Sequence, residues 1–275
     1  MKIDSHQHFW NYCPEDYDWI SADMAVIRRD FGPADLKITA QSSGIEGSVV
    51  VQARQTLDET KWLLDLAAAD SFIKGVVGWL PLASSDIDEV LDSLASQSAL
   101  KGARHVLQGQ ADLSFLQGPS FNHGIRALTG SNLTYDLLIT ASQLPDVIAF
   151  VDLHPAQSFI LDHIAKPTIE GPPPADWVQH LRTLAQRPNV ACKFSGVVTE
   201  VRLPVWTPEL LRPYFDVVLD AFGPERLMFG SDWPVCLVRS EYDRWVQFVA
   251  SCSSALSSDE QAKIFGGNAS QWYNL

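Results

Sequence analysis

The chain has 275 residues, of which 46% are hydrophobic and 19% are charged, and its formal net charge is −13 at pH 7. This length and composition suit a folded protein with a large core and exclude an intrinsically disordered chain. The acidic balance argues against nucleic acid or an anionic membrane as a partner, because both attract basic surfaces. We expect one domain over residues 1–275.

The sequence contains no run of about 18 apolar residues, which a membrane-spanning helix requires. No basic and then apolar leader precedes the first predicted strand, so we expect no signal peptide and a cytoplasmic location. The 4 cysteines are widely spaced and form no CxxC pair, which is typical of a reducing compartment. Cys236 follows a candidate catalytic stretch, but a buried structural role is favoured over a nucleophilic one.

Short apolar, β-branched runs recur along the chain and predict buried strands. They occupy residues 2–8, 47–53, 73–80, 100–106, 133–139, 159–164, 190–195 and 226–230. Helix-patterned segments lie between them at residues 57–69, 87–96, 175–186 and 208–222. The last of these has Thr207 as a predicted N-cap and Pro208 at its first position. The alternation indicates repeated strand–helix units.

Eight such units without a hairpin signal predict a closed (β/α)8 barrel, or TIM barrel, whose typical length is about 250 residues. A doubly wound open sheet is the alternative, but it requires a glycine-rich turn after the first strand. This chain has His6-Gln7-His8 there. Residues 11–41 are long for one connection, so we predict a loop over the barrel mouth with a short helix near residues 33–42.

The first strand carries two histidines, His6 and His8. Residues two apart on a strand share a face, so these histidines are predicted to point the same way, with Asp4 one step deeper. Their side chains would start about 7 Å apart along the strand and could converge on one ion or water molecule. Imidazole is the commonest metal ligand among side chains.

The active site of a (β/α)8 barrel lies at the carboxyl ends of its strands. Ionisable residues recur at the predicted ends, where an unpaired charge is costly. They are His6, His8, Arg104, His105, His163, Lys193 and Asp232. In a regular strand Arg104 and His105 point to opposite faces, so at most one faces the pocket unless the strand has ended. By the same alternation Asp162, next to His163, is interpreted as structural.

Five segments together resemble the amidohydrolase superfamily: IDSHQHFW at the start, DHIAKP around His163, KFSG around Lys193, FGSDWPV around Asp232, and IFGGNASQWY near the end. The resemblance covers residues 3–273 and is to amidohydrolase family 2, which includes sugar lactonases of the L-fuconolactonase and L-rhamnonolactonase kind. It implies a distorted TIM barrel.

In that superfamily, residues matching His6, His8, His163 and Asp232 surround the hydrolytic water, and metal-binding members hold a divalent ion there, often zinc. This chain lacks the carboxylated-lysine motif and the accompanying histidines of two-metal members. The resemblance therefore implies one metal ion or none.

We predict hydrolysis of a sugar lactone, such as L-fucono- or L-rhamnono-lactone, with Asp232 as general base on water. His6, His8 and His163 would hold one zinc ion or, in the metal-free alternative, the water and the carbonyl directly. Without a metal, Arg104, His105 or Lys193 would polarise the carbonyl. The predicted catalytic residues are Asp232, His163 and Lys193, and the predicted substrate contacts are Arg104, His105, Trp10, Gln52 and Asp136, with Trp79 a weaker candidate.

Two alternatives remain open at this stage. A hydrolase of an acidic lactone or a decarboxylase on the same barrel would need two or more arginines in the mouth, and only Arg54 and Arg104 lie near predicted strand ends. A non-catalytic carbohydrate-binding barrel would need no base at Asp232. The lactone, its ring size, the metal and a homo-oligomeric state are not fixed by the sequence.

Overall fold

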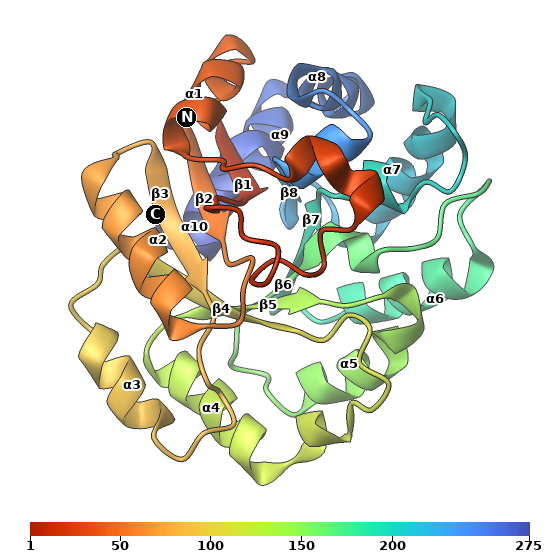
Figure 1. The fold of residues 1–275 in the computed structure, drawn as a ribbon. Helices are drawn as coiled ribbons and strands as arrows, with labels where there is room; N and C mark the ends of the chain where they lie inside the picture. The colour runs from red at the N-terminus through yellow and green to blue at the C-terminus, as the bar shows by residue number, and fades with distance from the viewer.

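Eight parallel strands form one sheet in the order β1 to β8 in the computed structural model, which describes residues 1–275 (Figure 1). The strands are β1 (Ile3–Gln7), β2 (Gly47–Val51), β3 (Ile73–Gly78), β4 (Leu100–Val106), β5 (Thr134–Leu138), β6 (Phe159–Leu161), β7 (Val190–Phe194) and β8 (Leu227–Phe229). Each strand pairs in parallel with the next in sequence. The predicted TIM barrel is therefore confirmed.

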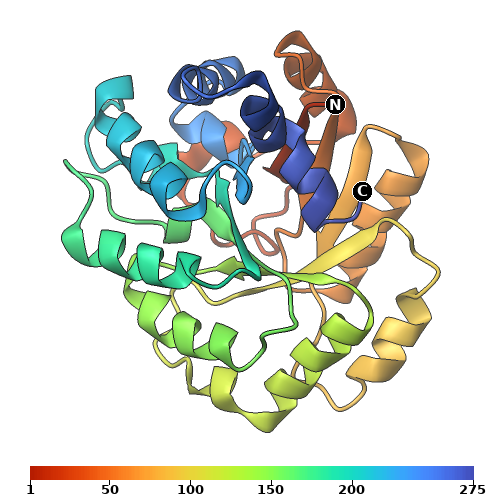
Figure 2. The same cartoon turned by 180° about the vertical axis from the view of Figure 1, so that it is seen from behind.

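A ring of helices covers the outside of the barrel (Figures 1 and 2). They are α1 (Pro33–Ser42), α2 (Leu57–Ala69), α3 (Ile87–Leu94), α4 (Pro119–Gly130), α5 (Leu144–Asp152), α6 (Ala175–Ala185), α7 (Pro208–Phe222), α8 (Tyr242–Cys252), α9 (Ser258–Ala262) and α10 (Asn268–Trp272). The predicted N-cap of α7 is present, because the Thr207 side chain accepts a hydrogen bond from the Leu210 amide. No helix is both long and apolar enough to cross a bilayer.

The barrel is distorted where its first and last strands meet. Closure there consists of a parallel bridge between Gln7 and Trp233 and a 2.6 Å hydrogen bond from Ser5 Oγ to Phe229 O. The pairing of β1 with β2 also shifts register between Asp4 and Gln7. This irregularity breaks the two-residue alternation along β1.

The expectation that Asp4 shares a face with the two histidines is therefore wrong. Its carboxylate turns toward β8, where it accepts hydrogen bonds from the Ser231 amide at 2.9 Å and from Tyr242 Oη at 3.0 Å. Ile3 packs inside the lower end of the barrel. Because of the register shift, Ile3 and His6 both face the barrel interior although they are three residues apart. A strict alternation would place Asp4 on the same face as His6, and the structure does not.

The sixth strand ends three residues earlier than predicted, at Leu161. Asp162–Ala165 then form a short turn in which His163, Ile164 and the following residues have positive φ angles. A run of left-handed L-residues costs roughly 1–2 kcal/mol per residue and cannot continue a strand.

The segment between β1 and α1 forms the predicted loop over the barrel mouth (Figure 1). Its two ends are joined by an antiparallel bridge, in which Trp10 and Phe31 exchange backbone hydrogen bonds of 3.0 and 2.9 Å. A short 3-10 helix, η1 (Ala22–Ile27), lies within it. The predicted helix near residues 33–42 is α1, which starts where the Asp35 carboxylate accepts a hydrogen bond from the Gly32 amide.

The opposite end of the barrel is closed by the end of the chain. Apolar side chains of six strands fill this end together with Ala269 and Tyr273. Figure 2, seen from behind, shows α10 in front of the barrel, on the side away from the mouth loop. The mouth and the floor of the barrel are therefore covered by the two ends of the sequence.

Candidate active site

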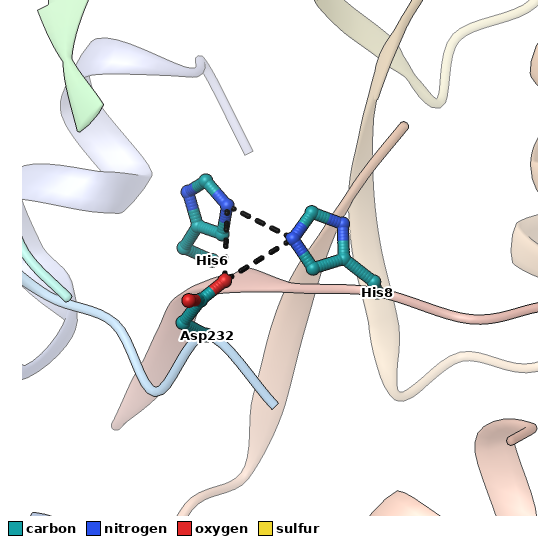
Figure 3. A group of neighbouring side chains, drawn as sticks. All are labelled: His6, His8 and Asp232. Atoms are coloured by element: carbon teal, nitrogen blue, oxygen red, sulfur yellow. Dashed lines mark hydrogen bonds and ion pairs between the residues drawn. The ribbon is translucent and has the colours of Figure 1, made fainter. Parts of the chain in front are cut away.

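A cluster of imidazoles and one carboxylate lies at the carboxyl end of the barrel. His6 lies on β1, His8 directly follows this strand, and Asp232 follows β8 (Figure 3). His6 Nε2 lies 3.2 Å from His8 Nε2, and Asp232 Oδ1 lies 3.2 Å from His8 Nε2 and 3.8 Å from His6 Nε2. His163, after β6, places its Nε2 3.9 Å from the same oxygen. The structure thus brings together four side chains from three distant parts of the sequence.

Unusual backbone conformations hold these side chains in place. His163 and Asp232 have φ angles of 52° and 60°, a left-handed region that L-residues seldom adopt. Such strain clusters at functional sites. Gly196, with φ of 63°, allows the close approach, since a Cβ there would lie 2.4 Å from His163 Nδ1. Gly230 does the same directly after β8, where a Cβ would lie 2.9 Å from the Cβ of His6.

The hydrogen-bond partners of His8 leave its second ring nitrogen facing another acceptor. Its Nδ1 donates to Val51 O at 2.7 Å, so in the neutral ring Nε2 carries a lone pair. That lone pair faces Asp232 Oδ1 at 3.2 Å, and a carboxylate oxygen is also an acceptor. Two acceptors at this distance require a proton or a metal ion between them. The chemistry of the donor set therefore fits a cation.

The spacing of the three donor atoms matches a single zinc ion. Tetrahedral zinc with ligands at about 2.0–2.1 Å separates neighbouring donors by about 3.3 Å. The three distances among His6, His8 and Asp232 are 3.2, 3.2 and 3.8 Å. Three protein ligands would leave one position open, as in catalytic zinc sites. His6, Asp162 and His163 also approach one another closely, but Asp162 already pairs with two cations, Lys193 and Arg104.

For each ionisable group of the cluster, burial and the neighbouring charges have opposing effects on the pKa. Burial lowers the pKa of His163 to about 4, against the opposing attraction of Asp232. Burial acts to raise the pKa of the Asp232 carboxyl, but His163, His8 and His6 together hold it below its ordinary value. Asp232 is therefore ionised at neutral pH while the His163 ring is neutral.

A second polar layer lies directly beneath the cluster. Lys193 Nζ contacts Asp136 Oδ2 at 2.5 Å and Asp162 Oδ1 at 3.0 Å. Arg104 Nη1 contacts Asp162 Oδ2 at 2.9 Å, and Asp162 Oδ1 lies 3.2 Å from His6 Nδ1. We refer to Asp136, Asp162 and Lys193 as the lower layer, and to His8, His163 and Asp232 as the upper layer.

The positions of Lys193 and Asp136 correct two expectations. Both side chains have no exposed surface, and neither lines the pocket. Lys193 lies two residues before Ser195 on β7, and it is Ser195 whose Oγ meets His163 Nδ1 at 3.0 Å. The alternation along the strand gives the correct face for Lys193, but its side chain lies one layer below the residues that line the cavity. Asp162 also departs from expectation, since it faces the barrel interior.

The upper layer opens into a cavity of about 610 Å³ at the barrel mouth. Of the sequence-predicted residues it is lined by His8, Gln52, Arg104, His163 and Asp232. Its remaining walls are Glu15, Asp16, Asp18, Trp19, Ala53, Arg54, Gln55, Thr56, Val106, Gln108, Leu138, Lys166 and Val235. Arg104 reaches it from β4, with its guanidinium fixed by Gln52 Oε1 at 3.1 Å as well as by Asp162.

Trp10 and His105 do not lie in this cavity. Trp10 is fully buried beneath the mouth loop, where its Nε1 donates to Arg29 O at 2.9 Å. Trp19, whose ring centroid is 5.8 Å from that of Trp10, lines the pocket in its place. His105 points outside the barrel and accepts a 3.2 Å hydrogen bond from Trp79 Nε1. Because Arg104 faces inward on a regular strand, its neighbour faces outward.

The acidic wall of the pocket was not anticipated from the sequence. Glu15, Asp16 and Asp18 come from the mouth loop, whose path has no periodic pattern. The aromatic residues of that loop are the sequence feature that indicates a contribution to the pocket, and Trp19 is the one that lines the cavity. Cys236 is fully buried, and burial raises the pKa of its thiol well above the ordinary value, in agreement with a structural role.

Fold and site together define a class: a TIM barrel with a His/Asp cluster, suited to one divalent ion, at the carboxyl ends of its strands. Residues 3–275 match the family model described as Amidohydrolase, and the chain belongs to this family.

Several relatives extend over essentially the whole chain. An L-fucono-1,5-lactonase from Burkholderia multivorans is 41% identical over 100% of this chain and 96% of its own length. An L-fucono-1,5-lactonase from Burkholderia ambifaria is 38% identical with the same coverage. An L-rhamnono-gamma-lactonase from Scheffersomyces stipitis is 26% identical over 71% of this chain and 67% of its own.

A solved structure of an amidohydrolase from Burkholderia multivorans with bound zinc has a TM-score of 0.96. It is 41% identical in sequence and covers 100% of this chain and 99% of its own.

Proposed function

We propose that this chain hydrolyses L-fucono-1,5-lactone, or an L-sugar 1,5-lactone of closely related stereochemistry, to the sugar acid. One structural observation carries the proposal: Asp232 Oδ1 and the His6 and His8 nitrogens face one another within 3.8 Å at the base of an open, polar pocket. The 41% identity to an L-fucono-1,5-lactonase supports this substrate.

Asp232 acts as the base in this proposal. It takes a proton from water as the water oxygen bonds to the lactone carbonyl carbon. The bond from that carbon to the ring oxygen then breaks, and Asp232 returns the proton to the ring oxygen. The product is an open-chain hydroxy acid, which ionises and releases a proton to the solvent. The low pKa of Asp232 keeps it unprotonated and ready for the first step.

Zinc is the metal ion that we propose for the cluster. His6, His8 and Asp232 would hold it, and its chemistry is to lower the pKa of a water molecule to about 7. The Nε2 atom of His163 lies 3.9 Å from Asp232 Oδ1, and we propose that this ring orients the water.

Arg104 is the residue that we propose as the carbonyl-polarising group. Arg104 lines the pocket, and its guanidinium is held in place by Asp162 and Gln52. Lys193 and His105, the other sequence-based candidates, lie outside the cavity. A fixed cation aimed at a developing oxyanion is among the strongest contributions to acyl-transfer catalysis.

The charges around the cavity favour a neutral lactone over an acidic one. Each cation that lines it already contacts a carboxylate: Arg54 pairs with Asp16 at 2.7 Å, Arg104 with Asp162 at 2.9 Å and Lys166 with Glu200 at 3.4 Å. Glu15 and Asp18 add negative charge to the wall. A substrate carboxylate would have to compete with these protein carboxylates for each cation, whereas the hydroxyls of a sugar can donate to the acids of the wall.

The test is a panel of lactones whose hydrolysis is followed as proton release with a pH indicator. Each rate is compared with the rate in buffer alone, because 1,5-lactones also open spontaneously. The panel contains L-fucono-1,5-lactone, its D-enantiomer, L-rhamnono-gamma-lactone and an acidic lactone. We expect release well above the spontaneous rate, greatest for the first compound. Release equal to the buffer rate for every lactone would overturn the proposal and leave a binding barrel. Elemental analysis of the same protein checks for one zinc per chain.

A further inference from the structure

Two apolar side chains line the barrel mouth without belonging to the hydrophobic core. Val106 and Leu138 are the last residues of β4 and β5, they pair with each other in the register of the sheet, and both line the cavity. Neither belongs to a hydrophobic core cluster of the protein. Their sequence neighbours Leu107 and Leu137 do belong to the larger cluster, as expected from the alternation of faces along a strand. Val106 and Leu138, which we call the apolar pair, therefore turn their side chains into the cavity.

The apolar pair lies one step above Arg104, the group that we propose for polarising the lactone carbonyl. Arg104 precedes Val106 by two residues on β4 and faces the same side of the strand. It pairs with Asp136 in the register, just as Val106 pairs with Leu138. Two residues span roughly 7 Å along a strand. A substituent a few bonds away from a carbonyl that contacts Arg104 would therefore meet the apolar pair.

The apolar pair has little to offer a hydroxyl group. Its side chains carry no polar atom, and three of its four backbone polar groups already have partners. Val106 N donates to Gln55 Oε1 at 3.0 Å, and Val106 O accepts from Gln110 Nε2 at 2.7 Å. Leu138 O accepts from two backbone amides of the loop that follows β4, at 3.2 and 2.9 Å. A hydroxyl held against the pair would give up hydrogen bonds to water without replacing them, whereas a methyl group would gain from burial.

The acids of the cavity wall lie on the other side of the barrel. Glu15, Asp16 and Asp18 come from the loop that follows β1. Asp16 is held there by Arg54, which follows β2. The strands β4 and β5 are half-way round the barrel from the closure between β8 and β1. The cavity therefore presents acids on the side of the mouth loop and the apolar pair on the side of β4 and β5.

This division matches the division of polar groups around a sugar 1,5-lactone. The ring carbon that carries the leaving oxygen, C5, also carries C6, whereas the ring hydroxyls lie on C2 to C4. We propose that Val106 and Leu138 are specificity-determining residues, which contact C6 of the bound lactone and select a methyl group there. The preferred substrates are then the lactones of 6-deoxy sugars. This inference rests on the lactonase activity proposed above and assigns the part of the substrate that each wall recognises.

The test compares two lactones that differ only at C6. L-fucono-1,5-lactone has a methyl group, and L-galactono-1,5-lactone has a hydroxymethyl group in its place. Selectivity is the ratio of the two kcat/KM values after subtraction of the rates in buffer. Val106→Thr and Leu138→Asn introduce polar atoms into the apolar pair with little change of size. Val235→Thr is the matched control, because Val235 lines the same cavity after β8.

We expect the wild type to prefer the 6-deoxy lactone about tenfold, since an apolar pocket discriminates only moderately against an added hydroxyl. The ratio should fall to about twofold or less in Val106→Thr and Leu138→Asn, and in Val235→Thr it should stay close to that of the wild type. A ratio of two rates is insensitive to a partial loss of folded protein. Equal kcat/KM values in the wild type, or an unchanged ratio in both variants of the apolar pair, would overturn the inference and leave the lactonase activity in place.

A binding measurement tests the apolar pair without turnover. L-fucose and L-galactose differ by the same group at C6 and have a six-membered ring without the ester. Isothermal titration calorimetry should give a several-fold lower Kd for L-fucose in the wild type, and Val106→Thr should remove this difference. Equal affinities in the wild type would overturn the inference even if no lactone is hydrolysed.

Discussion

The barrel contains two polar layers that are built from similar side chains but differ in access and pairing. In the lower layer, the Lys193 ammonium lies between two carboxylates, and Lys193, Asp136 and Asp162 are all fully buried. In the upper layer, His8 Nε2 and Asp232 Oδ1 face each other as two acceptors, and both residues line the pocket. Ionic groups with complete pairing are structural here, whereas incomplete pairing beside a cavity marks the reactive groups.

The pKa values of two buried carboxylates, Asp162 of the lower layer and Glu59 outside both layers, show the same contrast. Burial opposes ionisation of Asp162, but Lys193, His6 and Arg104 hold its pKa well below the ordinary value. Glu59 on α2 is 4% exposed and accepts hydrogen bonds only from the amides of Ala53 and Arg54, so burial raises its pKa to about 7. The charges of Lys193, His6 and Arg104 beside Asp162, which have no counterpart within hydrogen-bond distance of Glu59, account for the difference between these two acids.

The largest effect is expected in the upper layer. Asp232→Asn removes the proposed base while keeping the size of the side chain, and we expect kcat to fall about a thousandfold. Lactone turnover and circular dichroism measure activity and folding in parallel. Asp65→Asn, at an exposed position of α2 outside the cavity, is the matched control and should change kcat less than about threefold. Equal losses in both variants would show that Asp232 has no special role.

A lower-layer variant should affect stability first. Lys193→Met leaves Asp136 and Asp162 without their shared cation, and we expect the free energy of unfolding to fall by about 3–5 kcal/mol. Urea denaturation measures this loss. Lys101→Met removes a surface lysine whose Nζ contacts Asn274 O, and its effect should stay within about 0.5 kcal/mol. A loss below about 1 kcal/mol for Lys193→Met would contradict the structural role of the lower layer.

Glu59 tests the pairing rule through the pH dependence of stability. The carboxyl has an ordinary pKa of 4.5 and a folded value of about 7, so between these values the folded state retains a proton that the unfolded state has lost. Stability therefore decreases as pH rises through this window. Glu59→Gln removes the effect, and relative to the wild type it should gain up to about 3 kcal/mol between pH 5 and pH 8. A difference that does not change with pH would refute the raised pKa.

The smallest effect is expected at the rim of the pocket. Trp19 is 40% exposed and lines the cavity, so Trp19→Ala should raise KM about fivefold through loss of apolar contact with the sugar, with kcat little changed. Val26→Ala, at a 53% exposed position of the same loop outside the cavity, is the matched control. The same shift in both variants would indicate a change of the loop as a whole.

Much of the fold could be predicted because it depends on local patterns. Apolar runs of strand length alternate with helical patterns, and this repeat specifies the barrel and its strand order. Helix α7 was predicted to the residue because Thr207, Pro208 and Gly223 mark its two ends chemically. The histidines and Asp232 could be identified for a similar reason. Polar residues directly after buried strands of a barrel are expected at its mouth, because burying them unpaired is costly.

The positions of the remaining side chains depended on backbone irregularities that the two-residue repeat of a strand does not predict. The register shift in β1 displaced Asp4, and the left-handed turn after Leu161 directed both Asp162 and His163 inward. A strict alternation allows only one of two neighbours to face the barrel interior.

The sequence by itself determined that strand–helix units build a barrel and that histidines and an aspartate stand where its strands end. The tertiary structure decided how deep in the barrel each side chain lies. As a result, Lys193 and Asp136 form a fully buried ion pair, whereas His8 and Asp232 line the pocket. The physical reason is that alternation along a strand specifies the face of a residue. Its depth depends on how eight tilted strands are staggered around the barrel.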